Sequence, residues 1–274
     1  MKIAILFSGH LRSLDKSIPD WKRKHPEFYD PNITDVFCHT WNGSNRTAWD
    51  NDNKERILLS NMFTIEDLKQ HMNVVSYSVE DYDSSPVGEI TKNNNYIGAN
   101  FSIAYGTKKV YELFKKYSDE KKIDYDLVIK TRVDTFLGKF PENIYGDWYE
   151  DHEKPDPLPL NYLQTKIKES ENTVMIPWYR TTDTNGTWTC DHGGIQDQIL
   201  IGNKKSMENI CCLYYEWLKQ NYSSITYWHI ETNHGRFVND YKIPIERFNY
   251  HFGIIRTGEG YNKRNINWLG YTRK

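Results

Sequence analysis

Short apolar runs alternate with amphipathic segments over the first half of the chain, and this alternation limits the possible folds more than any other feature. The run at residues 2–7 is continuously apolar after Lys2, which is typical of a strand buried on both faces, and residues 34–41 are predicted as a second apolar strand. Amphipathic, helix-like stretches lie at 8–29 and 67–72, and a third strand is predicted at 73–82. Strand, helix, strand, helix, strand is the pattern of a doubly wound α/β sheet.

The rest of the chain extends this pattern. Residues 93–122 carry apolar side chains near helical spacing with lysines on the far face, and they lead into 125–137, predicted as a fourth, central strand. Residues 141–172 are rich in Pro, acids and Tyr with little periodicity, which predicts a long surface excursion. The elements expected after it are strands at 172–179 and 196–202, helices at 204–222 and 230–241, and strand-like pieces from Ile243 onward. We expect one α/β domain over residues 1–274.

Composition excludes several classes of protein. The formal net charge is −2, so no global positive field would attract nucleic acid, and we expect no nucleic-acid partner. The apolar run at the amino end is too short for a signal peptide, and no segment reaches the ~18 to 20 apolar residues of a membrane span. The four cysteines form no CxxC pair, which favours packed, reduced thiols. These features indicate a cytoplasmic protein without a transmembrane segment.

The turn after the first strand is the first candidate binding site. It reads FSGHLRS, so a glycine lets the backbone approach a ligand, and Ser8, His10 and Arg12 bring hydrogen-bond donors suited to a phosphate or a nucleobase. The turn has neither the GxGxxG pattern of dinucleotide-binding folds nor the GxxxxGK[ST] pattern of a P-loop. An ordinary strand-to-helix turn is the alternative interpretation.

The predicted central strand ends in a second polar group. Lys130, Arg132 and Asp134 alternate at period two, so they are expected to share one face of the strand near its carboxyl end, where α/β sheets bind ligands. A carboxylate there can bind a divalent cation that bridges diphosphate oxygens. The alternative is a structural salt bridge between Arg132 and Asp134. We favour the ligand site, because burying such groups is costly unless something pairs with them.

Asp-x-Asp pairs also occur elsewhere, so their mere presence is a weak signal. The pair Asp124 and Asp126 stands at the start of the predicted central strand, which is the wrong end for a ligand site in such a sheet. Asp81 and Asp83 follow the third strand and remain either a coincidence or a nucleoside contact.

Further candidates lie in the second half of the chain. In TCDHGGIQDQILIG, two glycines are bracketed by Asp191, His192 and Asp197, so a carboxylate could accept the proton of a substrate hydroxyl there. For Asp197, the alternative is a helix cap. Near the carboxyl end, His251 and Arg256 follow a strand-like run, and His251 is either a metal ligand or a structural histidine.

Together these segments resemble the GT-A class of glycosyltransferases, in particular the small bacterial and viral sugar transferases of lipopolysaccharide, capsule and viral glycan synthesis. The resemblance covers most of residues 1–215 and rests on four landmarks in order: FSGHLRS, DVFCHTW, NFSIAYGTKKVYEL with YDLVIKTRVDTFL, and GGIQDQILIGNKKSM. It implies a GT-A-like, Rossmann-type mixed and mostly parallel sheet flanked by helices. Residues 1–140 would form the half that binds the nucleotide sugar and 141–274 the half that binds the acceptor.

The resemblance also implies roles for the candidate residues. In such enzymes the first strand and its turn hold the nucleotide, the acid after the central strand binds Mn²⁺ or Mg²⁺ with the diphosphate, and the downstream Gly-rich loop faces a glycan or other hydroxyl acceptor. The expected contacts are Ser8, Gly9, His10, Arg12, Lys130, Arg132 and Arg256 to the nucleoside diphosphate sugar, Asp134 and His251 to the metal, and Asp197 or Asp191 as the catalytic acid or base.

The sequence departs from the GT-A pattern at one motif, and two other functions are possible alternatives. The usual Asp-x-Asp of such enzymes is here Arg132-Val133-Asp134, so Arg132 stands where a second carboxylate is expected and could itself neutralise the diphosphate. A sugar-phosphate nucleotidyltransferase would need a GxGTR-like first turn followed by a Pro-Lys pair, which is missing here. A non-catalytic nucleotide- or glycan-binding module is the other alternative.

Overall fold

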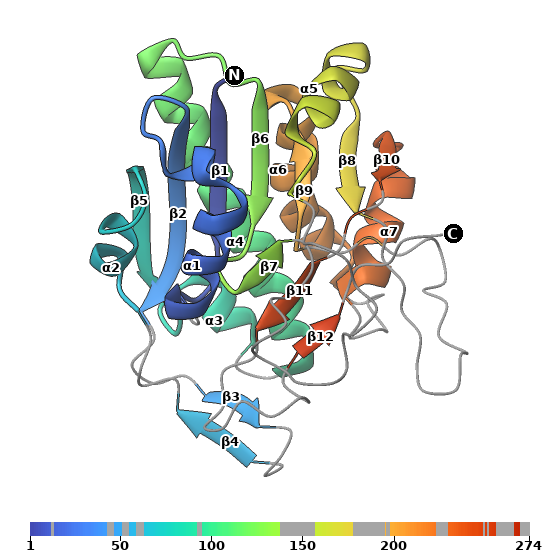
Figure 1. The fold of residues 1–274 in the computed structure, drawn as a ribbon. Helices are drawn as coiled ribbons and strands as arrows, with labels where there is room; N and C mark the ends of the chain where they lie inside the picture. Colours follow the sequence, from blue (N-terminus) through green and yellow to red (C-terminus); the bar gives the residue numbers. More distant parts are fainter. Residues whose placement is uncertain are drawn as a thin grey trace.

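A seven-stranded mixed sheet runs through the molecule, with helices on both of its faces (Figure 1). In this computed structural model the described residues are 1–11, 14–42, 47–50, 55–58, 63–91, 95–137, 157–177, 195, 198–222, 230–248, 250, 252–255 and 266–268. The strands across the sheet are, in order, β10 (Ile245–Phe248), β8 (Val174–Pro177), β9 (Leu200–Gly202), β6 (Leu127–Thr131), β1 (Ile3–Ser8), β2 (Thr34–Asn42) and β5 (Val74–Asp81). The predicted α/β class with a mixed, mostly parallel sheet is confirmed.

The register of the sheet explains why its central strands are so apolar. β1 pairs in parallel with β2 on one side and with β6 on the other, and every residue of β1 is buried. Only β9 runs antiparallel to its neighbours β6 and β8. A strand covered by helices on both faces has no solvent side, so its sequence is a continuous apolar run.

Helices cover the two faces of the sheet with separate hydrophobic cores. One core contains side chains of α4 (Asn95–Lys121), α6 (Lys204–Gln220) and α7 (Ile230–Tyr241). The core on the opposite face contains side chains of α1 (Leu14–Lys24), the 3-10 helix η1 (Pro26–Tyr29), α2 (Ile65–Lys69) and α5 (Leu160–Glu169). A short helix, α3 (Pro86–Thr91), packs beside α4. This division into two covered faces is the doubly wound arrangement expected from the sequence.

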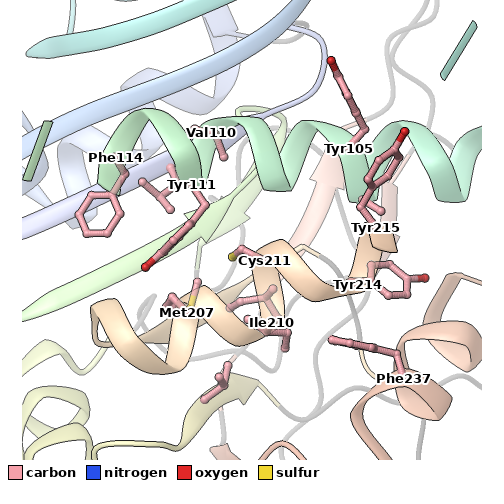
Figure 2. Packing of buried hydrophobic residues seen from close by; sticks show 14 of the residues in the cluster. Tyr105, Val110, Tyr111, Phe114, Met207, Ile210, Cys211, Tyr214, Tyr215 and Phe237 are labelled. Atoms are coloured by element: carbon pink, nitrogen blue, oxygen red, sulfur yellow. The ribbon is translucent and has the colours of Figure 1, made fainter. Parts of the chain in front are cut away.

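The predicted long helix, α4, packs against α6 across the first core (Figure 2). Tyr111 and Phe114 are fully buried there, and the Tyr111 hydroxyl donates to the Lys204 carbonyl at 2.6 Å. Cys211 lies in the same core as a free, buried thiol, and Cys38 is a second one in β2. The packed thiols expected from the sequence are therefore confirmed for these two residues.

A second, three-stranded sheet lies below the carboxyl ends of the central strands in Figure 1. It consists of β7 (Thr135–Leu137), β11 (Phe252–Ile255) and β12 (Ile266–Trp268), all antiparallel. A separate hairpin pairs β3 (Thr47–Asp50) with β4 (Glu55–Leu58). The small sheet matters for function because β7 begins directly after Asp134 and so carries the chain away from the end of β6.

Two predicted elements were wrong in detail. The strand expected over 125–137 ends at Thr131, and after a turn the chain enters β7 in the other sheet. The surface excursion expected over 141–172 contains α5, whose Leu160, Leu163 and Ile167 are buried at spacings of three and four residues. Among the helices of the described ranges, none is long and apolar enough to cross a membrane.

Candidate functional site

The connections out of β1 and β6 define the point where the strand order of the sheet reverses. From β1 the chain continues to β2 and then β5 on one side, and it returns through α3 and α4 to β6 on the other side of β1. In open α/β sheets, ligands bind outside the carboxyl ends of the strands at this switch point. Gly9 follows β1 and Asp134 follows β6, so the two candidate turns from the sequence meet at this edge.

The first turn is shaped by Gly9. Its φ of +110° lies in a region that residues with a Cβ rarely adopt, and its N–H donates to the His39 carbonyl of β2 at 3.1 Å. The Ser8 hydroxyl lies 3.5 Å from that of Thr107 in α4. The turn is therefore fixed on both sides, by β2 and by α4. Ser8, Gly9 and His10 occupy the predicted place at the end of β1, while Arg12 falls outside the described residues.

The turn after β6 contains the salt bridge that the sequence left as an alternative. Arg132 donates from Nε to Asp134 Oδ1 at 2.8 Å and from Nη2 to Oδ2 at 2.7 Å. The Asp134 side chain is 1% exposed and that of Arg132 is 18% exposed. The Thr135 N–H donates to the Arg132 carbonyl at 3.1 Å and closes the turn. The expectation that these residues share one face of a strand was therefore wrong, because β6 ends before them.

This ion pair bears on the chemistry available to Asp134. A buried carboxylate is costly unless it is paired, and a bidentate guanidinium is the strongest pairing a side chain offers. Arg132 contacts both carboxylate oxygens of Asp134. Oxygen is the ligand that Mg²⁺ and Mn²⁺ prefer, and one carboxylate can suffice where phosphate and water supply the other ligands, but a metal role for Asp134 stays a prediction. No cluster of three or more His, Cys, Asp or Glu suited to a metal occurs among the described residues.

Lys130 lies within β6, two residues before Arg132 in the sequence. It is 1% exposed and pairs in register with Leu6 of β1 and Leu200 of β9, and both leucines belong to the core on the α4 and α6 side. Burial raises the pKa of the Cys211 thiol in that core, and the positive charge of Lys130 opposes the rise. The sequence grouped Lys130 with Arg132 and Asp134; β6 ends between them at Thr131, and a contact of Lys130 with the nucleotide sugar stays a prediction.

A polar cluster that sequence reasoning missed lies next to the first turn. Glu80 at the end of β5 accepts the Tyr105 hydroxyl at 2.8 Å, lies 3.2 Å from Lys109 Nζ and lies 3.6 Å from His39 Nε2. Burial lowers the pKa of His39 to about 4 although Glu80 opposes the shift, so this histidine is neutral at pH 7. The signal in the sequence was a histidine among the buried residues of a strand, and its partner Glu80 is distant in the chain.

Gly106 and Trp41 complete this corner of the site. A Cβ on Gly106 would lie 3.2 Å from His39 Nδ1, so the glycine lets α4 approach β2 closely. Trp41 is buried and its ring stacks on that of Tyr105 at 5.7 Å. Trp41 is therefore a core residue at this corner of the sheet.

Two other Asp-x-Asp acids, Asp126 before β6 and Asp81 at the end of β5, make contacts within the fold. Asp126 Oδ2 accepts the Lys2 N–H at 2.7 Å, and Oδ1 accepts Gln164 Nε2 at 2.7 Å. The interpretation that this acid stands at the wrong end of the strand is confirmed, since it lies at the start of β6. At the end of β5, Asp81 accepts the Ser84 N–H at 3.0 Å, a turn contact that leaves a nucleoside role untested.

The segments around the remaining candidates are partly described. Asp191, His192, Asp197, His251 and Arg256 themselves fall outside the residues that the structure describes. Two described neighbours bracket Asp197: Ile195 is buried with its N–H donating to the Glu231 carbonyl of α7 at 3.1 Å, and Gln198 is buried. The helix-cap alternative for Asp197 was wrong, because β9 comes before α6 and the residue that caps α6 is Asn203.

The strand between His251 and Arg256 in the sequence is β11. It pairs antiparallel with β7, and Ile254 lies opposite Thr135, the residue after Asp134. The fold therefore brings the backbone of the carboxyl-terminal candidate segment beside the backbone of the Asp134 turn. Sequence reasoning gave no sign of this pairing, because nothing in the local pattern of either segment specifies a partner more than a hundred residues away.

Comparisons with known proteins do not assign this chain to a family. No model of a known protein family matches the chain, and a search of curated proteins found no similar sequence. The functional argument therefore rests on the residues and on their places in the fold.

Proposed function

We propose that this chain is a GT-A-type glycosyltransferase that transfers a sugar from a nucleoside diphosphate sugar to a hydroxyl of a glycan or another acceptor. The observation that carries the proposal is the meeting of the Gly9 turn and the Arg132–Asp134 turn at the carboxyl ends of the neighbouring strands β1 and β6. A turn with a glycine, which has no Cβ, suits close contact with a nucleotide, and a cation beside a carboxylate suits a diphosphate with its metal.

Each group has a distinct role in this proposal. The backbone and donors of residues 8–10 would hold the nucleoside part of the donor. Arg132 would donate to the diphosphate, and Asp134 would be the protein ligand of a divalent cation. The metal, when bound, supplies positive charge that stabilises the leaving diphosphate. An acid of the downstream loop, Asp197 or Asp191, would take the proton of the acceptor hydroxyl.

Catalysis would depend mainly on position and electrostatics. The turns that carry the candidate groups are fixed by contacts to β2, α4 and α1. Their hydrogen-bonding groups are therefore aligned before the nucleotide sugar binds. Groups aligned in advance stabilise a developing charge without the cost of reorganising during the reaction. The acceptor hydroxyl must also be held near the anomeric carbon of the sugar. Holding the two reacting groups in position lowers the barrier to transfer.

A binding module without catalysis is the second candidate. The bidentate contact of Arg132 occupies two lone-pair sites of Asp134, where the GT-A resemblance expects two carboxylates for the metal. A chain that kept this ion pair closed would bind the nucleotide without activating the diphosphate. Release of free nucleoside diphosphate separates the two candidates, since only the enzyme produces it.

A thermal-shift panel tests donor binding directly. We expect one or more nucleoside diphosphate sugars to raise the melting temperature, and the shift to increase with Mn²⁺. A ligand present at 100 times its dissociation constant stabilises the folded state by about 2.7 kcal/mol, which is readily measured. The matched controls are the free sugar and the nucleoside without phosphate. A panel in which no nucleotide sugar moves the melting temperature, with or without metal, would contradict the proposal.

A further inference from the structure

His25 makes an unusual long-range contact just after the end of α1. Its side chain is completely buried, and its Nε2 accepts the backbone N–H of Leu158 at 3.2 Å. Its Nδ1 lies 3.4 Å from the Glu27 carboxylate. An Nε2 that accepts must carry no proton, so the ring is the neutral tautomer with its proton on Nδ1, directed to Glu27.

This contact holds the start of α5. The helix follows Pro159, which has no N–H, and no side chain caps its first turn. Leu158 and Leu160 are buried in the core on the α1 side, and the Leu160 N–H donates to the Leu158 carbonyl at 2.8 Å. A helix without a side-chain cap depends more on the contacts that fix the residues before it. His25 therefore takes the place of a cap from a distant part of the chain.

The surroundings of His25 keep its ring uncharged. Its ring stacks on that of Phe28 at 4.7 Å. The charged groups that face it from α1 and η1 are Asp20, Lys24 and Glu27, and Lys24 Nζ donates to Asp20 at 2.7 Å. Burial lowers the pKa of His25, against the attraction of Glu27.

We propose that His25 is an acid-sensitive latch on the start of α5. Protonation places a second N–H on the ring, at Nε2. Nε2 can then no longer accept the Leu158 N–H, and two hydrogen-bond donors face each other. Because the folded-state pKa lies below the ordinary value of about 6.5, opening of the latch takes up a proton. The contact is at full strength above pH 6.5 and weakens as the pH falls below that value.

The latch is placed where its release would reach the candidate site. Trp21, one turn earlier in α1, donates its indole N–H to the Thr135 carbonyl at 2.7 Å. Trp21 and His25 both pack on Phe28. One helix thus holds the residue after Asp134 and, through His25, the start of α5. The inference stands independently of the proposed function, because it concerns the helix and not the ligand.

Amide hydrogen exchange followed by NMR tests the latch at its own atom. The protection factor of the Leu158 amide is expected to fall by about tenfold from pH 7.5 to pH 5.5. At pH 5.5, one unit below the ordinary histidine pKa of about 6.5, protonation of His25 in the open form shifts the open–closed equilibrium toward opening by about that factor. The amide of Val174, which donates to the Pro244 carbonyl at 2.9 Å, is the internal control and should keep its protection.

Substitutions separate the latch from general acid destabilisation. His25→Gln can offer a carbonyl oxygen in place of Nε2 but does not titrate, so the Leu158 amide should then show no pH dependence. The exposed histidine His71, changed to Gln, is the matched control and should leave the wild-type response intact. Equal falls at Leu158 and Val174, or no fall at Leu158 in the wild type, would overturn the latch. Both of these outcomes are read from wild-type protein, so the test holds even if His25→Gln does not fold.

Discussion

Replacing Asp134 with asparagine is expected to slow donor turnover by about 10²-fold or more and to weaken its response to Mn²⁺. The substitution keeps the shape of the side chain and removes the charge that would bind a metal–diphosphate pair. Loss of one group that stabilises a developing charge typically costs about 10²- to 10³-fold in rate. The fold should persist, because Arg132 is 18% exposed and retains contact with water when its partner becomes neutral. Release of nucleoside diphosphate at several Mn²⁺ concentrations measures the effect.

Asp126→Asn is the matched control for Asp134→Asn. Asp126 lies at the start of β6, the opposite end of the same strand, and its oxygens accept Lys2 N–H and Gln164. Its substitution should affect the melting temperature and leave turnover at the wild-type level wherever the protein is folded. An Asp134→Asn protein with wild-type turnover and an unchanged metal response would show that Asp134 serves only as the partner of Arg132.

Asp197→Asn is expected to bind the nucleoside diphosphate normally and to transfer sugar at least about a hundredfold more slowly. If transfer inverts the configuration of the sugar, a general base must take the acceptor proton, and loss of such a base costs about 10²- to 10⁴-fold. Two described residues flank Asp197 in the sequence: the Ile195 N–H donates to the Glu231 carbonyl of α7, and Gln198 is buried. Calorimetry of donor binding and a transfer assay on the same preparation separate binding from chemistry.

Two comparisons make the Asp197 result specific. Asp191→Asn, from the same loop, should transfer near the wild-type rate if Asp197 is the base. The reverse pattern, with a normal rate for Asp197→Asn and a large loss for Asp191→Asn, would move the role to Asp191. Normal transfer by both variants would remove the general-base assignment altogether and favour a retaining mechanism that needs no such base.

The strands and helices with strong local patterns were predictable from the sequence. β1 is an apolar run up to Ser8, β2 lies where a second strand was expected, and the helix expected at 230–241 has the observed bounds of α7. α4 and α6 showed apolar side chains near helical spacing, and both bury that side in the same core. These elements were predictable because burial leaves a pattern of apolar residues in the sequence. Burial on both faces of a strand gives a continuous run, and burial on one face of a helix gives a repeat near 3.6 residues.

The break between β6 and β7 was not predictable from the same kind of pattern. Apolar residues stand on both sides of Arg132, so the run reads as one strand, and Val133 is buried as a strand residue would be. The chain leaves the sheet because Thr135 pairs with Ile254 of β11, and that partner is far away in the sequence. α5 was missed for a different reason: its three buried residues lie beside a Pro-rich segment that conceals their period.

Some parts of the candidate site were also predictable from the sequence, and others were not. The places of Gly9 and Asp134 followed from a rule about the carboxyl ends of strands, which needs only the order of the elements. The Glu80 cluster with His39, Tyr105 and Lys109 needed the actual packing of α4 on β2 and β5. So did the contact of His25 with Leu158, which joins residues 133 positions apart. Polar contacts of this range have no local signature in a single sequence.

Release of free nucleoside diphosphate from a nucleoside diphosphate sugar is the measurement that tests the central claim most directly. The donor chosen is the one that gives the largest thermal shift, and wild-type protein is compared with Asp134→Asn in the presence of Mn²⁺ and a hydroxyl acceptor. The account predicts steady release by the wild type and a rate lower by about 10²-fold or more in the variant. Tight donor binding with no release by the wild type would contradict the claim that the chain is an enzyme and would favour the non-catalytic binding module.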